Sequence, residues 1–183
     1  MYDHIIELTK SLLLSPGLKT EYDAYEGDFR GNLVINAKDA NGVAQPLLLN
    51  HPLPVEGFAQ VDMSEPPKNP GAPFPRAYVY HLMSEYPERE QEYDLVNGVH
   101  RIGLSIYHGG QIAADAEMVA GRLTAATKKY LERNQYIFGG LPRAVGASTV
   151  SFVNTIVPGM QLPKIVIPYH LIMIVKIKEL RNT

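Results

Sequence analysis

The chain has 183 residues, of which 45% are hydrophobic and 20% are charged, and its formal net charge is −2 at pH 7. These values are typical of a globular protein with one buried core, and the lack of excess positive charge argues against a general nucleic-acid-binding protein. Cysteine is absent, which excludes disulfides, a thiolate nucleophile and cysteine-based metal sites and is consistent with a reducing cytoplasm.

An amphipathic helix over residues 2–14 is the first predicted element. Apolar side chains recur at helical spacing from Ile5 to Leu13, and Ser15-Pro16-Gly17 is a sequence that ends helices. Residues 18–30 show no clear period. We interpret 2–14 as a helix and not as a signal peptide, because no basic segment precedes an apolar core. No run of about 18 apolar residues predicts a membrane span.

Residues 31–75 are predicted to add an edge hairpin and a long strap to the domain. The hairpin pairs 32–37 with 43–49 around a polar turn, and Pro46 restricts the return strand to a sheet edge. Residues 50–75 contain seven prolines. We therefore expect this strap to form no ladder of its own, to contribute little to a core, and to lie on the surface or across a neighbouring subunit.

The next two predicted strands are 76–83 and 93–108, paired through a charged tip at 84–92. The even positions of the second strand are apolar from Ile102 to Ile106, so one face of this strand should be buried. The alternative is a tight turn at Asn97-Gly98, which would shorten the second strand. We favour the long strand, because 76–83 needs a partner.

The strongest helical period follows over residues 112–131, and its apolar stripe should pack on the even face of the preceding strand. Residues 139–163 are bounded by Gly and Pro and are predicted to be a loop insertion with one β-branched patch. A final strand over 169–178 has a wholly apolar odd face. Together these elements predict a single α+β domain over 1–183, with an antiparallel β-sheet, a long β-hairpin and helices packed on one face.

The histidines show no metal-binding pattern. His100 and His108 point to the same side of one strand but lie roughly 26 Å apart, at about 3.3 Å per residue. We expect both to be structural, and their replacement by alanine to leave folding nearly intact. No phosphate-loop, serine-nucleophile or metal motif is present, so the sequence predicts no catalytic residue, cofactor or metal. If the strands that carry them were neighbours, four residues would form the rim of a pocket: Tyr80, His81, Tyr169 and His170.

Five parts of the chain follow one another in a distinctive order. They are a strand beginning at Phe74-Pro75 and reaching Leu82, an acidic tip over Glu85–Asp94, an alternating strand over Val99–Tyr107, a helix over Ile112–Leu131 and a long apolar strand over Tyr169–Leu180. In this order, and with a short helix before them, they resemble the tail terminator (tail-tube capping) proteins of tailed bacteriophages. The resemblance is a pattern of elements over about half the chain, to which the hairpin, the strap and the 139–163 segment are additions.

The resemblance implies a virion structural protein and not an enzyme. Members of this family form six-membered rings of identical subunits that cap the tail tube and join the tail to the head or neck. The implied partners are further copies of the chain, the tail-tube and sheath proteins, and the head–tail connector proteins. DNA would pass through the lumen without specific binding. Such a protein is assembled in the host bacterial cytoplasm and is located in the tail or neck of the virion, with no membrane contact.

The candidate subunit-interface or lumen residues lie in the acidic tip and in the strap: Glu85, Glu88, Arg89, Glu90, Glu92, Asp94, Pro66, Pro67 and Pro70. Two alternatives stay open. The chain could be another neck, collar or baseplate-end tail protein, or it could be a small ligand-binding or enzymatic α+β domain with the Tyr/His rim as its pocket. A ring-sized oligomer would favour the assembly protein, and a monomer with a deep pocket would favour the other class.

Overall fold

The computed structural model describes residues 1–24, 57–68, 70–71, 73–87, 89–90, 95–110, 113–155 and 165–180. The predicted hairpin at 31–49 lies outside these residues. The elements in chain order are α1 (Tyr2–Leu13), β1 (Gln60–Asp62), β2 (Arg76–Glu85), β3 (Arg89–Glu90), β4 (Leu95–Gly110), α3 (Ala113–Arg133), the 3-10 helix η1 (Gln135–Gly140), β5 (Thr149–Thr155) and β6 (Ile165–Leu180).

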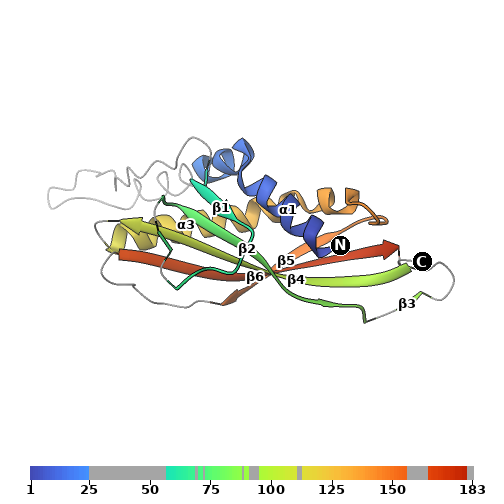
Figure 1. Cartoon of the computed structure of the whole chain (residues 1–183). Coiled ribbons are helices and arrows are strands. Elements are labelled where there is room, and N and C mark those ends of the chain that lie inside the picture. The colour runs from blue at the N-terminus through green and yellow to red at the C-terminus, as the bar shows by residue number, and fades with distance from the viewer. Residues whose placement is uncertain are drawn as a thin grey trace.

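The strands form one sheet in the order β1-β2-β4-β6-β5, and β3 pairs with β4. The neighbouring strands are antiparallel, except that β1 runs parallel to β2. Helices α1 and α3 lie on the same side of the sheet, above it in Figure 1. The prediction of an α+β fold with helices on one face is therefore confirmed, with a sheet that is mixed and mostly antiparallel.

Burial on the helix-covered face follows the predicted pattern. The even positions of β4 from Ile102 to Ile106 are fully buried and share one hydrophobic core with Leu123 of α3. This confirms the predicted packing of the helix on the strand. The sequence predicted only one buried face, however, and Ser105 and Tyr107 on the other face are buried as well. The reason is a second, smaller cluster that covers this part of the sheet: Phe74, Tyr78, Tyr80, Tyr107 and Val166.

The N-terminal helix ends where the sequence predicted, but a second helical segment begins at once. The Ser15 hydroxyl donates a hydrogen bond to the Leu12 carbonyl (2.7 Å) at the end of α1. Residues 16–24 are then helical, although the sequence shows no clear period over 18–30. Pro16 is the cause, because proline stops a preceding helix and also fits the first position of the next one.

The two central strands pair as one long hairpin. β2 pairs with β4 from Arg76–Tyr107 to Glu85–Val99, with an irregularity between His81 and Met83. This confirms the long-strand interpretation and places Asn97-Gly98 inside β4 and not in a turn. Gly98 has another role, because a Cβ atom at this position would collide with the Glu179 carboxylate on β6.

Part of the strap belongs to the core, which corrects the expectation that it contributes little to one. Val61 in β1 is 5% exposed and Phe58 before it is 1% exposed, and both belong to the main core. Asp62 at the end of β1 forms an ion pair with Arg76 of β2 at 2.8 Å. The prolines explain the error, since none lies between Pro54 and Pro66 and this stretch keeps all of its backbone donors.

The segment predicted as a loop insertion at 139–163 contains a strand of the sheet. β5 pairs with β6 from Thr149–Lys176 to Thr155–His170. Val150 is buried, while Ser151 and Val153 on the other side of the strand are exposed. This is the period-two pattern of an edge strand, and it coincides with the β-branched patch. The flanking Gly and Pro residues concealed it in the sequence.

Candidate functional site

The side of the sheet opposite α1 and α3 carries no helix in the part of the chain that the structure describes (Figure 1), and we call it the open face. The register places Met83, Val153 and Leu180 on this face, where they are 45%, 50% and 47% exposed. Lys176 and Lys178 lie on it too, and both are exposed. Apolar side chains from three strands beside basic groups make this face a candidate contact surface for another macromolecule.

Ser105 lies near the middle of the open face and joins two aromatic rings. Its Oγ is 2.7 Å from Nδ1 of His170 and 3.4 Å from the Tyr80 hydroxyl. Burial, followed by the nearby hydroxyls of Tyr80 and Tyr78, raises the pKa of Tyr107 to about 12. Burial lowers the pKa of His170. Burial therefore favours the neutral forms of Tyr107 and His170.

The predicted rim of Tyr80, His81, Tyr169 and His170 does not form. β4 lies between the two strands that carry these residues, so the strands are not neighbours. Tyr80 and His170 share the open face through Ser105, whereas His81 and Tyr169 point to the helix-covered face. The alternation of β-strand side chains separates each Tyr-His pair onto opposite faces of the sheet.

The described part of the acidic tip, Glu85 and β3, lies at the end of the β2–β4 hairpin, on the right in Figure 1. Glu85 ends β2 and forms an ion pair with Arg101. The backbone of Arg89 and Glu90 forms β3 against Val96 and Leu95. The other predicted tip residues, Glu88, Glu92 and Asp94, lie outside the described residues.

The three strap prolines differ in their surroundings. Pro67 is exposed, Pro66 is half-buried, and Pro70 is buried within the subunit. They belong to the connection from β1 to β2, which must be long because the two strands are parallel. Pro70 is therefore a packing residue of its own subunit, and of the three only Pro67 offers a wholly exposed ring to a partner.

His100 is the centre of a buried polar site that the sequence did not predict. It is 0% exposed and lies on the helix-covered face of β4. Its Nδ1 is 2.8 Å from Ser84 Oγ, and its Nε2 bonds to the buried Glu179 carboxylate of β6. Ser84 Oγ is also 2.9 Å from His81 Nε2. The rings of Tyr86 and His100 are nearly perpendicular, and their centres are 6.0 Å apart.

A carboxylate only accepts hydrogen bonds, so His100 donates from Nε2 to Glu179. The Ser84 hydroxyl bridges the two histidine rings, because it is bonded to Nδ1 of His100 and to Nε2 of His81. This chain joins β2, β4 and β6 at the end of the sheet that carries the tip. The burial of His100 on this face of the strand agrees with the sequence pattern, and His108, on the same face, is half-buried.

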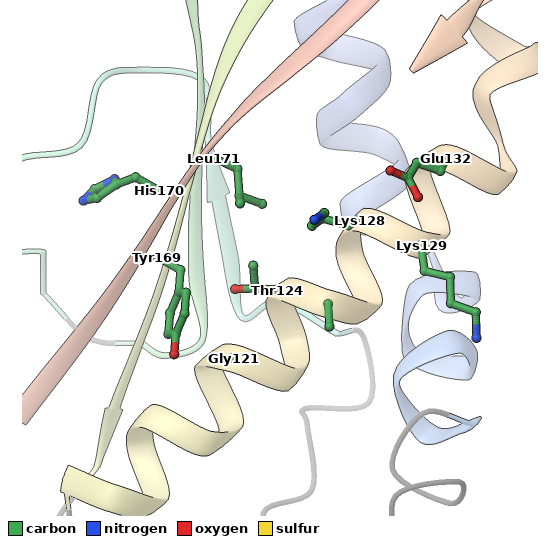
Figure 2. Close-up of a pocket in the computed structure, with 9 residues that line it drawn as sticks. Gly121, Thr124, Lys128, Lys129, Glu132, Tyr169, His170 and Leu171 are labelled. Atoms are coloured by element: carbon green, nitrogen blue, oxygen red, sulfur yellow. The ribbon is translucent and has the colours of Figure 1, made fainter. Parts of the chain in front are cut away.

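A cavity of about 350 Å³ lies between α3 and β6. Figure 2 shows Tyr169 and Leu171 directed from β6 toward Gly121 and Thr124 of α3, while the His170 ring points to the other side of the strand. A side chain at Gly121 would meet the Tyr169 hydroxyl at 3.2 Å. Because glycine has no side chain, the Tyr169 ring can pack against α3 at this position.

The two lysines that line the cavity have partners. Lys129 forms an ion pair with Glu21 at 2.9 Å, and Lys128 lies 6.0 Å from the centre of the Phe152 ring. The Thr124 hydroxyl donates to the Ala120 carbonyl of its own helix (2.7 Å). These contacts commit the two lysines and Thr124, and Glu132 is the remaining charged side chain of the lining.

No family model and no curated protein matches the chain. Within the described ranges, no group of three or more His, Asp or Glu side chains gathers as a metal site. No helix in the same ranges is long and apolar enough to cross a membrane.

Proposed function

We propose that the protein is a virion structural subunit that assembles head-to-tail into a ring, caps the tail tube of a tailed bacteriophage and joins the tail to the neck. The observation that carries the proposal is the open face. An antiparallel sheet in a monomer usually exposes polar side chains on a face without helices. Here Met83, Val153 and Leu180 expose apolar side chains on that face, which favours contact with another protein.

The order of elements also supports this role. A helix precedes the β2–β4 hairpin, the hairpin carries the acidic tip, α3 crosses the sheet, and the long strand β6 follows. A tail-tube cap needs a rigid sheet and contact surfaces but no reacting group. The tip segment 85–94 has five carboxylates against Arg89, and like charge would discourage DNA from binding if the tip faces the channel.

Mass photometry of the purified protein tests the proposal directly. The expected result is a ring-sized oligomer, six subunits as in the resembling family, and the capping of purified tail tubes at one end in electron micrographs. Leu180→Glu places a charge on the open face and should weaken the ring or the capping. The matched control is Tyr136→Glu, at a 69% exposed position on η1. A protein that stays monomeric and ignores tail tubes would contradict the proposal.

A second candidate function is hydrolysis by Ser84, and one observation favours it. Ser84, His100 and Glu179 are bonded in the order of a serine nucleophile, a base and an orienting carboxylate. Against it, Ser84 Oγ is also bonded to His81, and His100 is fully buried. A fluorophosphonate probe distinguishes the two functions. Covalent labelling that Ser84→Ala abolishes and Ser11→Ala retains would favour the enzyme, and an unlabelled protein would exclude it.

A further inference from the structure

The sheet ends in two edges that have no outer strand in the described chain. β5 is the last strand on one side. On the other side, β1 covers β2 only from Arg76 to Tyr78, so residues 79–85 of β2 have no outer partner among the described residues. Such edges present rows of backbone donors and acceptors that can pair with another chain.

The sequence of β5 lacks the features that protect an edge from pairing. Its seven residues, TVSFVNT, include no charged side chain and no proline. Proteins usually protect exposed edges with lysine, proline or an irregular strand. β2 has a single irregularity, between His81 and Met83. β5 is therefore the edge better suited to accept a partner strand.

We propose that β5 of one copy pairs with residues 79–85 of β2 in the next copy, so that the sheet continues from subunit to subunit. This inference rests on the proposed ring. β5 is antiparallel to β6, and the successive antiparallel pairs give β5 and β2 opposite directions. Neighbours related by rotation about an axis along the strands would bring these two edges together as an antiparallel pair.

The contact must form between chains, because β4 and β6 separate the two edges within one subunit. Three strand spacings of about 4.8 Å place the edges roughly 14 Å apart. The contact joins two different surfaces, and heterologous contacts of this kind close into rings.

Side chains beside the two edges fit the pairing. Val153 of β5 and Met83 of β2 both lie on the open face, and both are about half exposed. Placed side by side across the new pair of strands, they would cover each other, as apolar cross-strand neighbours do. The same contact would remove two exposed apolar groups from the surface of the subunit.

The test is cross-linking of Met83→Cys/Val153→Cys in the assembled protein. The natural chain has no cysteine, so each new thiol is unique. A short bismaleimide links two thiols that are about 7 Å apart, which is the length of two residues along a strand. Treatment with this reagent should yield a ladder of covalently linked subunits, and the largest species should have the mass of the complete ring. The two sites are too far apart within one chain for this reagent. The control is Leu14→Cys/Val153→Cys, whose first site is the 39% exposed residue after α1.

A second variant tests the same edge without cross-linking. Ser151→Lys places a charge at an exposed position of β5 and should raise the concentration at which rings form by at least tenfold, with an unchanged melting temperature of the subunit. Rings that form in mass photometry but give no ladder, and that tolerate Ser151→Lys, would overturn the β5–β2 pairing and leave the ring itself standing. A protein that never leaves the monomer would overturn both proposals.

Discussion

At the scale of single residues, His100 shows how a buried, hydrogen-bonded histidine differs from one that can be replaced without loss of stability. Both of its ring nitrogens are bonded, one to Ser84 and one to the buried Glu179. The sequence expectation that its removal leaves folding nearly intact does not take account of these partners. It rested on the distance to His108, which is correct but does not bear on the stability of the site.

We predict that His100→Ala destabilises the subunit by about 3–5 kcal/mol. The replacement leaves the Glu179 carboxylate, which is only 6% exposed, without its partner, and the cost of breaking a buried pair on one side is of this order. Urea titration provides the measurement. His4→Ala, at an exposed position of α1, is the control and should change stability by less than about 0.5 kcal/mol. A loss below about 1 kcal/mol for His100→Ala would show that the chain of bonds contributes little.

Tyr107 makes the stability of the subunit depend on pH in the alkaline range. Its pKa in the folded protein is about 12, against 10.0 for an ordinary tyrosine, chiefly because the ring is buried. The folded state therefore favours the neutral phenol. This contribution to stability is complete below pH 10 and is lost as the pH rises through 10 toward 12.

We therefore expect the free energy of unfolding to fall between pH 10 and pH 12, by roughly 2–3 kcal/mol from this residue. The measurement is a series of denaturant titrations across this range, compared with Tyr107→Phe. The phenylalanine variant should lose less stability over the same interval. Equal slopes for the two proteins would assign the alkaline loss to other tyrosines.

The candidate site was predictable only in part from single residues. The alternation in β4 placed His100 on the buried face, and this was correct. Its partners could not be identified from the sequence, because Glu179 lies on β6 and reaches His100 only through the register of two strands far apart in the chain. The prediction of the Tyr-His rim was wrong for a related reason. The order of strands in a sheet depends on the whole fold and cannot be predicted from the sequence of a single segment.

At the scale of elements, the predictions were reliable where a long period was present. α1, α3 and the β2–β4 hairpin were all expected close to their observed bounds, and β6, expected over 169–178, is longer and spans Ile165–Leu180. β1 and β5 were missed, because each is a short edge strand flanked by Pro or Gly. The strand patterns are only three and seven residues long, and the flanking Pro and Gly residues led us to predict loops at these positions.

The strap contains a core strand, although the sequence predicted that it would contribute little to a core. Removal of residues 60–72 takes away β1 with its buried Val61, so we expect the deletion to destabilise the subunit itself. Val61→Ala isolates the effect and should cost about 2 kcal/mol, because it removes two buried methyl groups from the core. Thermal unfolding compares it with Met63→Ala, a 46% exposed neighbour expected to be nearly neutral. Equal melting temperatures for Val61→Ala and Met63→Ala would contradict the role of this part of the strap in the core.

At the scale of the whole molecule, the sheet has unlike sides and unlike edges. One side is covered by helices and the other exposes apolar groups, and one edge is a regular strand while the other is partly covered by β1. In a two-fold dimer, an edge of the sheet pairs with the same edge of the partner subunit. The other, different edge of each subunit is then left without a partner. Repeated head-to-tail contact satisfies both edges in every copy, which is why the proposed ring suits this sheet.

The pairing of β4 with β6 also determines how the subunit folds. Their closest partners in sequence are Gly110 and Ile165, and their most distant are Leu95 and Leu180. Closing such long loops loses chain entropy before any cross-strand contact forms, so this ladder should be a late event, whereas the β2–β4 hairpin closes a shorter loop and can form early. Until β6 arrives, β4 keeps an apolar edge without a partner. Newly made subunits are therefore most prone to aggregate during this interval, and chaperones that shield β4 would raise the yield of folded protein.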